Sequence, residues 1–193
     1  MNRIVYPQLI FFLVMISFEG CMYEDMTHMS SEEILWLSPY KEGDMRLYKS
    51  PNKAFDTLFI ELAEISNSRF PLYISESGVQ KYKAGGIVNY IIFHHGQRIG
   101  GSLMASKEND SIFKLSFYLD RRFSYALQRK DTCNFITNGG FYSDCMIIND
   151  NNSYLSPPIE NNIVKSFVWS KSRGLVYYQY EDGTIYQLYS HDL

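Results

Sequence analysis

The sequence contains few of the residue patterns that mark a catalytic or metal-binding site. Of its four histidines, His94 and His95 are adjacent, so on a strand their rings would point to opposite faces and not toward one metal ion. His28 and His191 lie near the two ends of the chain, which leaves no zinc-ligand spacing. Residues 100–104 begin like a nucleophile elbow, but a methionine stands where the second glycine belongs. We therefore predict no metal and no cofactor, and the sequence favours a protein that is not an enzyme.

The sequence also lacks a block of positive charge. Its 18 lysines and arginines are outnumbered by 21 aspartates and glutamates, which gives a formal net charge of −3. Proteins that bind nucleic acid neutralise phosphates with clustered Lys and Arg, so we predict no nucleic-acid partner. Beyond residue 20, no apolar run approaches the roughly 20 residues that a membrane-spanning helix needs.

The one long apolar run lies near the start of the chain, from Leu9 to Ile16. It follows the positive Arg3 and precedes the small residue Gly20. A positive segment, a short apolar core and a small residue before the cut are the parts of a secretory signal peptide. We predict that residues 1–20 are a signal peptide and that the mature chain begins at Cys21.

Gly20 and Cys21 match the end of the signal that bacterial lipoproteins carry, whereas Phe18 and Glu19 depart from that family's pattern. With the strand and turn pattern of residues 167–188, the chain resembles small uncharacterised bacterial lipoproteins. The resemblance implies acyl chains such as palmitate on Cys21, which would be the membrane anchor. It implies a place at the bacterial outer membrane, periplasmic or surface-exposed, and it implies no activity. The alternative is an ordinary secretory peptide in which Cys21 is incidental.

The chain has only three cysteines, and an odd thiol in a secreted protein needs an explanation. Lipidation of Cys21 leaves Cys133 and Cys145, which flank an Asn138-Gly139-Gly140 turn signal. A hairpin about this turn places the two opposite each other, about 4.5 Å apart at Cα and within disulfide range. We predict a disulfide between them. The alternative is two free buried thiols, and a register slip of one residue would point the side chains to opposite faces.

We divide the mature chain into a lipidated tether, residues 21–33, and a single antiparallel β domain, residues 34–193. At the boundary, Ser30 and Glu33 fit a capping box, which predicts one or two helical turns before Pro39.

The sequence of the domain predicts a succession of β-strands, because residues alternate between apolar and polar in stretches such as Ile112–Phe117. Turn signals separate the strands, and Asp182-Gly183 is the strongest, typical of a two-residue hairpin turn. The predicted strands are Met45–Lys49, Phe55–Leu62, Phe70–Ile74, Ile87–Phe93, Ile99–Ala105, Ile112–Leu119, Phe141–Ile148, Val164–Trp169, Leu175–Tyr180 and Thr184–Tyr189. The fold class is therefore mostly β: an antiparallel meander forming a barrel, an open half-barrel or a sandwich, with few short helices. Arg121–Lys130 is an ambiguous helix candidate, and Asn149–Asn162 is predicted to be a surface loop.

Aromatic residues are the one compositional excess, with sixteen tyrosines and thirteen phenylalanines. Tyrosines at alternating positions can present rings to a protein or glycan partner. The leading hypothesis is a lipid-anchored, noncatalytic binding or structural module of the bacterial cell envelope. A second is a carrier of a lipid or other hydrophobic ligand in an open β-barrel. A third is an envelope hydrolase, in which His94 or His95 would meet a carboxylate or a hydroxyl in a cleft.

Overall fold

The structure is a computed structural model, and it describes residues 25–67, 71–74, 80–109, 111–124, 132–138, 140–156 and 162–189. The predictions for residues 1–20, for Cys21 and for residues 21–24 lie outside the described residues. So does most of the helix candidate, residues 125–130.

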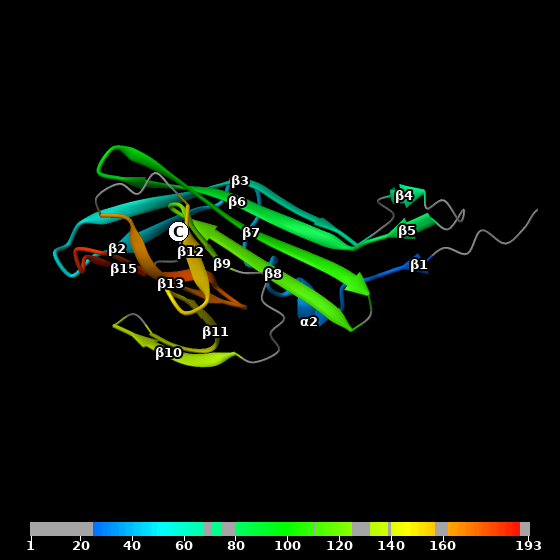
Figure 1. Cartoon of the computed structure of the whole chain (residues 1–193). Coiled ribbons are helices and arrows are strands. Elements are labelled where there is room, and N and C mark those ends of the chain that lie inside the picture. Colours follow the sequence, from blue (N-terminus) through cyan, green and yellow to red (C-terminus); the bar gives the residue numbers. More distant parts are fainter. Residues whose placement is uncertain are drawn as a thin grey trace, which may run out of the picture.

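Strands dominate the described residues, as the sequence predicted, and twelve of them form one antiparallel sheet (Figure 1). In sheet order they are β10 (Cys133–Thr137), β11 (Gly140–Ile148), β13 (Val164–Ser170), β14 (Gly174–Tyr180), β15 (Ile185–Leu188), β2 (Met45–Lys49), β3 (Phe55–Ser66), β6 (Gly85–His94), β7 (Gln97–Asn109), β8 (Ile112–Leu119), β9 (Arg122–Ser124) and β12 (Ser153–Leu155). A small second sheet holds β1 (Asp25–Met26), β5 (Gln80–Tyr82) and β4 (Pro71–Ile74). The one helix described is α2 (Ser31–Ile34).

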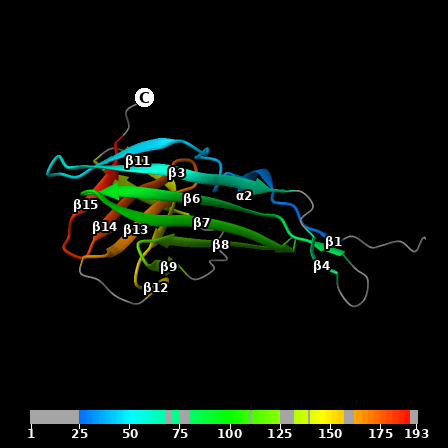
Figure 2. The ribbon, with the colours of Figure 1, turned by 90° about the horizontal axis from the view of Figure 1, so that it is seen from above.

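The large sheet curls into an open half-barrel, which decides among the three predicted architectures (Figures 1 and 2). β10 and β12 are its two edges. Side chains tie the β8–β9 region to the start of β13: the Val164 N–H donates to Asp120 Oδ2 at 2.9 Å, and Arg122 Nε donates to the Val164 carbonyl at 2.9 Å. Arg122 is 1 % exposed, and its guanidinium also pairs with Asp150 at 2.7 Å. These bonds hold β9 and β13 in position without a backbone ladder between them.

Aromatic rings fill the inside of the half-barrel. The buried Trp169 ring on β13 lies 5.6 Å from the Tyr40 ring, 5.9 Å from Tyr90 and 5.8 Å from Phe117, measured between centroids. Its indole N–H donates to the Trp36 carbonyl at 3.3 Å. Rings from four separate segments of the chain thus meet at one place, because a strand that alternates apolar and polar residues directs every second side chain inward.

The segment before β2 packs into one end of this interior. The predicted capping box is present: the Ser30 N–H donates to Glu33 Oε2 at 2.7 Å, and the Glu33 N–H donates to Ser30 Oγ at 3.2 Å. Glu33 also pairs with the buried Lys107 at 2.6 Å. Trp36 and Leu37 are buried directly after the helix. A Cβ at Gly86 would collide with the Leu37 side chain, so the close approach of this segment to β6 requires glycine there.

Three local predictions need correction. The Asp182-Gly183 hairpin has a three-residue loop, Glu181 to Gly183, because Tyr180 pairs with Thr184 and Gly183 adopts a positive φ of 87°. The predicted loop 149–162 contains the short strand β12, which has too few residues to show an alternating pattern. The helix candidate begins with strand β9, since its residues 122–124 pair with β8 and β12.

Candidate functional site

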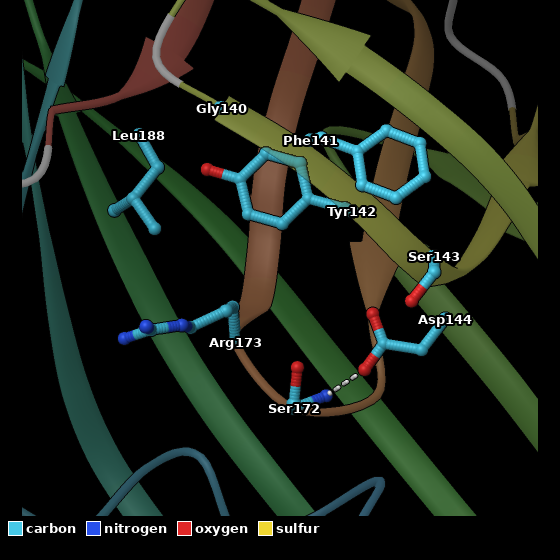
Figure 3. A pocket seen from close by; sticks show the side chains of 8 residues that line it. All are labelled: Gly140, Phe141, Tyr142, Ser143, Asp144, Ser172, Arg173 and Leu188. Carbon is cyan, nitrogen blue, oxygen red and sulfur yellow. Dashed lines mark hydrogen bonds between the residues drawn. The ribbon is translucent and has the colours of Figure 1, made fainter.

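Two hollows on the surface of the domain share the residue Leu188 of β15. The first, about 300 Å³, is lined by Gly140, Phe141, Tyr142, Ser143, Asp144, Ser172, Arg173 and Leu188 (Figure 3). The second, about 430 Å³, is lined by Lys49, Ser50, Pro51, Lys53, Asn138, Gln187, Leu188 and Tyr189. We call the two together the Leu188 groove. Each hollow is within the size range of sites that take small molecules, roughly 300–1,000 Å³.

The β10–β11 hairpin forms one wall of the groove. A second, smaller hydrophobic cluster, centred on Cys145, Val168 and Val176, lies on the outer face of β11, β13 and β14, and Phe135 of β10 packs against it. The Phe135 ring meets Tyr177 edge-on at 5.1 Å between centroids. At the tip of the hairpin, the Asn138 N–H donates to Gln187 Oε1 of β15 at 3.1 Å. These contacts place the first residues of β11 opposite the β13–β14 turn.

The one carboxylate in the groove, Asp144, is committed to that turn. Its Oδ1 accepts from Ser170 Oγ at 2.7 Å, and its Oδ2 accepts from the Ser172 N–H at 2.8 Å, as Figure 3 shows for Ser172. Burial by itself would raise the pKa of Asp144, but the hydrogen bonds from Ser172 and Ser170 outweigh it and hold the pKa below its usual value. The carboxylate therefore stays ionised and organises the turn.

The positive side chains of the groove, unlike Asp144, are not held by partners of opposite charge in the described residues. Within the described parts of the chain, Arg173, Lys49 and Lys53 form no ion pair with a carboxylate. Arg173 is exposed and extends along the first hollow beside Tyr142 and Leu188 (Figure 3). The Lys49 ammonium lies over the Tyr189 ring, 4.7 Å from its centroid. The groove thus combines three positive side chains with aromatic rings.

Exposed apolar side chains stand beside the groove. Ile136 and Phe141 are cross-strand partners in the β10–β11 hairpin, and they are 76 % and 62 % exposed. Phe141 also lines the first hollow. Isolated exposed apolar residues are ordinary, but a paired set at the rim of a polar hollow adds contact area for a partner.

His94 meets a carboxylate, as the hydrolase hypothesis required, but it does so inside the half-barrel. His94 Nδ1 lies 2.9 Å from Asp56 Oδ2, and the Tyr178 hydroxyl donates to the same oxygen at 2.5 Å. Asp56 is 1 % exposed, and the His94 ring packs against Tyr180 at 4.7 Å between centroids. Burial, and then the Asp56 charge, raise the pKa of Tyr178 well above its usual value. Neither hollow of the Leu188 groove is lined by this cluster, which links β3, β6 and β14.

Cys133 and Cys145 are register partners across the β10–β11 hairpin, so the predicted pairing of positions is confirmed. Both are free thiols in the structure, with Cys133 exposed and Cys145 buried. Cys133 Sγ donates to the Cys145 carbonyl at 3.3 Å, and an irregularity in the ladder lies between Cys133 and Phe135. Burial raises the pKa of Cys145 to about 12. The disulfide remains a prediction: thiol counting on denatured, unreduced protein should find neither cysteine titratable, and two titratable thiols would refute it.

Other kinds of site find no support in the described residues. No group of three or more His, Cys, Asp or Glu side chains there is arranged to hold a metal ion. In the same part of the chain, no helix combines the length and the apolar character needed to cross a membrane.

Comparisons with known proteins add no identification. The chain matches no protein-family model, no curated protein and no solved structure. The candidate site therefore depends on its own geometry. In the sequence, residues 171–174 and Asn138-Gly139 carry turn signals and no mark of a binding site. The groove forms where Arg173 and Asn138 lie beside β15, and no local pattern predicts that contact.

Proposed function

We propose that the protein is a lipid-anchored, noncatalytic binding module of the bacterial cell envelope, and that the Leu188 groove is its binding site. The observation that supports this most is the contrast in charge pairing at the groove. Its carboxylate, Asp144, is fully engaged in hydrogen bonds, whereas Arg173, Lys49 and Lys53 face the hollows without a carboxylate partner in the described chain. Convergent polar groups with aromatic walls are typical of a ligand site.

The filled interior favours this function over a lipid carrier. A carrier needs an apolar lumen, but inside the half-barrel the Trp169 ring packs against both Tyr90 and Phe117. Each is at most 1 % exposed. A hydrophobic ligand would have to displace rings whose burial holds the domain together. The open hollows lie on the outside.

The direction of the long strands suggests how an anchor would present the groove. β3 has 12 residues, from Phe55 beside the β2–β3 turn to Ser66. At about 3.3 Å per residue, its two ends are roughly 36 Å apart. The far end adjoins the segment that leads back toward Cys21, since Asn67 Nδ2 donates to the Met29 carbonyl at 3.1 Å (Figure 2). Acyl chains on Cys21 would therefore hold that end at the membrane, and the turn with Lys49 and Lys53 would point away.

The anchor is tested by fractionation and mass spectrometry. Native protein should sediment with membranes and carry acyl chains on Cys21, and Cys21→Ser should release it to the soluble fraction. More than one acyl chain is expected, because a single chain gives only marginal attachment. Unmodified wild-type protein in the soluble fraction would contradict the anchor.

The binding site is tested by photo-crosslinking in intact cells. A benzophenone amino acid is introduced at Ser143, which lines the first hollow, and at the exposed Lys165 of β13 as the matched control. We expect a discrete adduct from position 143 and none from position 165. Equal labelling from both positions, or none from position 143, would rule out the groove as the binding site.

A further inference from the structure

The charge of the Leu188 groove differs from that of the whole chain. The chain carries a net charge of −3, yet the side chains that face the two hollows without a charged partner in the described residues are cations. They come from two different parts of the chain: Arg173 lies between β13 and β14, whereas Lys49 ends β2 and Lys53 lies between β2 and β3. A cation without a counter-charge in a hollow favours an anionic ligand, because pairing adds Coulomb attraction and charge-assisted hydrogen bonds.

The pairing of β15 argues against an extended peptide along this strand as that ligand. Peptides that bind sheets usually add a strand to an unpaired edge. β15, which crosses the groove, is paired with β14 on one side and β2 on the other. The ladder positions of β15 therefore have partners inside the sheet. Recognition along β15 depends on side chains.

The side chains present are those that suit sugars. The half-buried Tyr142 ring lines the first hollow and has flat apolar faces. The half-buried Tyr189 ring lines the second hollow, with the Lys49 ammonium 4.7 Å from its centroid. The hydroxyl of Ser143 and the amides of Asn138 and Gln187 lie in the same linings. Hydroxyl and amide groups both donate and accept, as sugar hydroxyls do.

We propose that the Leu188 groove binds an acidic saccharide, with Arg173 pairing one anionic group in the first hollow and Lys49 and Lys53 pairing another in the second. The inference rests on the proposed function and specifies its ligand. The anionic group is a carboxylate or a phosphate. Arg173 suits either, since a guanidinium binds both groups through two parallel hydrogen bonds.

The test measures binding of defined probes to the detergent-solubilised full chain by isothermal titration calorimetry. Hexagalacturonate supplies carboxylates on a sugar backbone, and phosphorylated maltohexaose supplies phosphates. Methyl-esterified hexagalacturonate is the neutral control with the same backbone. Hexaglutamate carries carboxylates on a peptide. We expect at least one acidic saccharide to bind, more weakly as salt rises because ions screen exposed charge pairs, and we expect no binding of the ester or the peptide.

Variants locate the site. Arg173→Gln, and separately Lys49→Gln with Lys53→Gln, should each weaken binding about tenfold or more, because each removes charge-assisted hydrogen bonds to the ligand. Arg98→Gln with Lys165→Gln removes two exposed cations outside the groove and is the matched control. Its affinity should stay within about twofold of the wild-type value, since neither side chain lines a hollow and salt screens exposed charges.

Several outcomes would overturn the inference. Equal binding of the neutral ester would show that charge is not recognised, and tight binding of hexaglutamate would assign the groove to an acidic peptide. Equal losses in the groove variants and the control would place the site elsewhere. Failure of both acidic saccharides to bind would also refute it. The proposed function would still stand in these cases if position 143 gave its specific adduct in cells.

Discussion

Polar side chains meet opposite conditions inside the half-barrel and in the Leu188 groove. Inside, Asp56 satisfies both His94 and Tyr178, and Arg122 is held by Asp150, Ser153 and a backbone carbonyl. Burial makes an unpaired polar group costly there, so nearly every such group has a partner. In the groove, solvent removes that cost, and Arg173 needs no partner for the domain to fold. The interior residues are thus constrained by stability, whereas the groove cations leave room for a ligand.

The largest loss of stability is expected for a substitution in the aromatic core around Trp169. Trp169→Ala should lower the free energy of unfolding by about 3–5 kcal/mol, because it leaves a cavity among Tyr40, Tyr90 and Phe117. Phe141→Ala, at an aromatic side chain that is 62 % exposed, is the matched control and should change stability by less than about 0.5 kcal/mol. Chemical denaturation of both variants measures the difference. Similar values for the two would mean that the rings do not form the core.

The buried polar cluster should come next. Asp56→Ala should cost about 1–3 kcal/mol for each group that it leaves without a partner, namely the Tyr178 hydroxyl and the His94 ring. Tyr180→Phe is the matched control. Among the buried side-chain atoms that the structure describes, the Tyr180 hydroxyl is the one without a partner, so its removal should not destabilise the domain. A destabilised Tyr180→Phe would show that this hydroxyl is bonded in solution.

The sequence predicted much of the interior and almost none of the groove. Alternation in Ile112–Leu119 and the Asn138-Gly139 turn are local signals, and the strands and hairpin that they predicted are present. His94 and Asp56 come together only because β6 pairs with β3, and no local pattern reports which strands are neighbours. The groove depends on further strand pairings of this kind. Leu188 lies between the two hollows only because β15 pairs with β2. Strand order and curl are set by packing of the whole sheet, which short-range periodicity does not encode.

Asp144 has both a structural role and a place in the groove. Its carboxylate holds the β13–β14 turn, and the same residue lines the first hollow. Its pKa is lowered in the folded state, so its contribution to stability is complete above the unfolded pKa of about 4 and is lost as pH falls through the folded pKa. Asp144→Asn should cost about 1 kcal/mol near neutral pH, from weakened bonds to Ser170 and Ser172. Denaturation between about pH 6 and pH 2 should show the two proteins converging in acid. A constant difference across that range would mean that the charge of Asp144 plays no part.

The smallest effect on stability is expected for the groove cations themselves. Arg173 is exposed, and its backbone carbonyl, not its guanidinium, accepts the hydrogen bond from Arg46 at 2.8 Å. Arg173→Gln keeps that carbonyl, so the free energy of unfolding should change by less than about 0.5 kcal/mol. The same substitution should remove the adduct from position 143 in cells, because the ligand loses its charged contact in the first hollow. A large drop in stability would instead make Arg173 part of the architecture, like Arg122, and an unchanged adduct would show that the groove cations are not what the partner recognises.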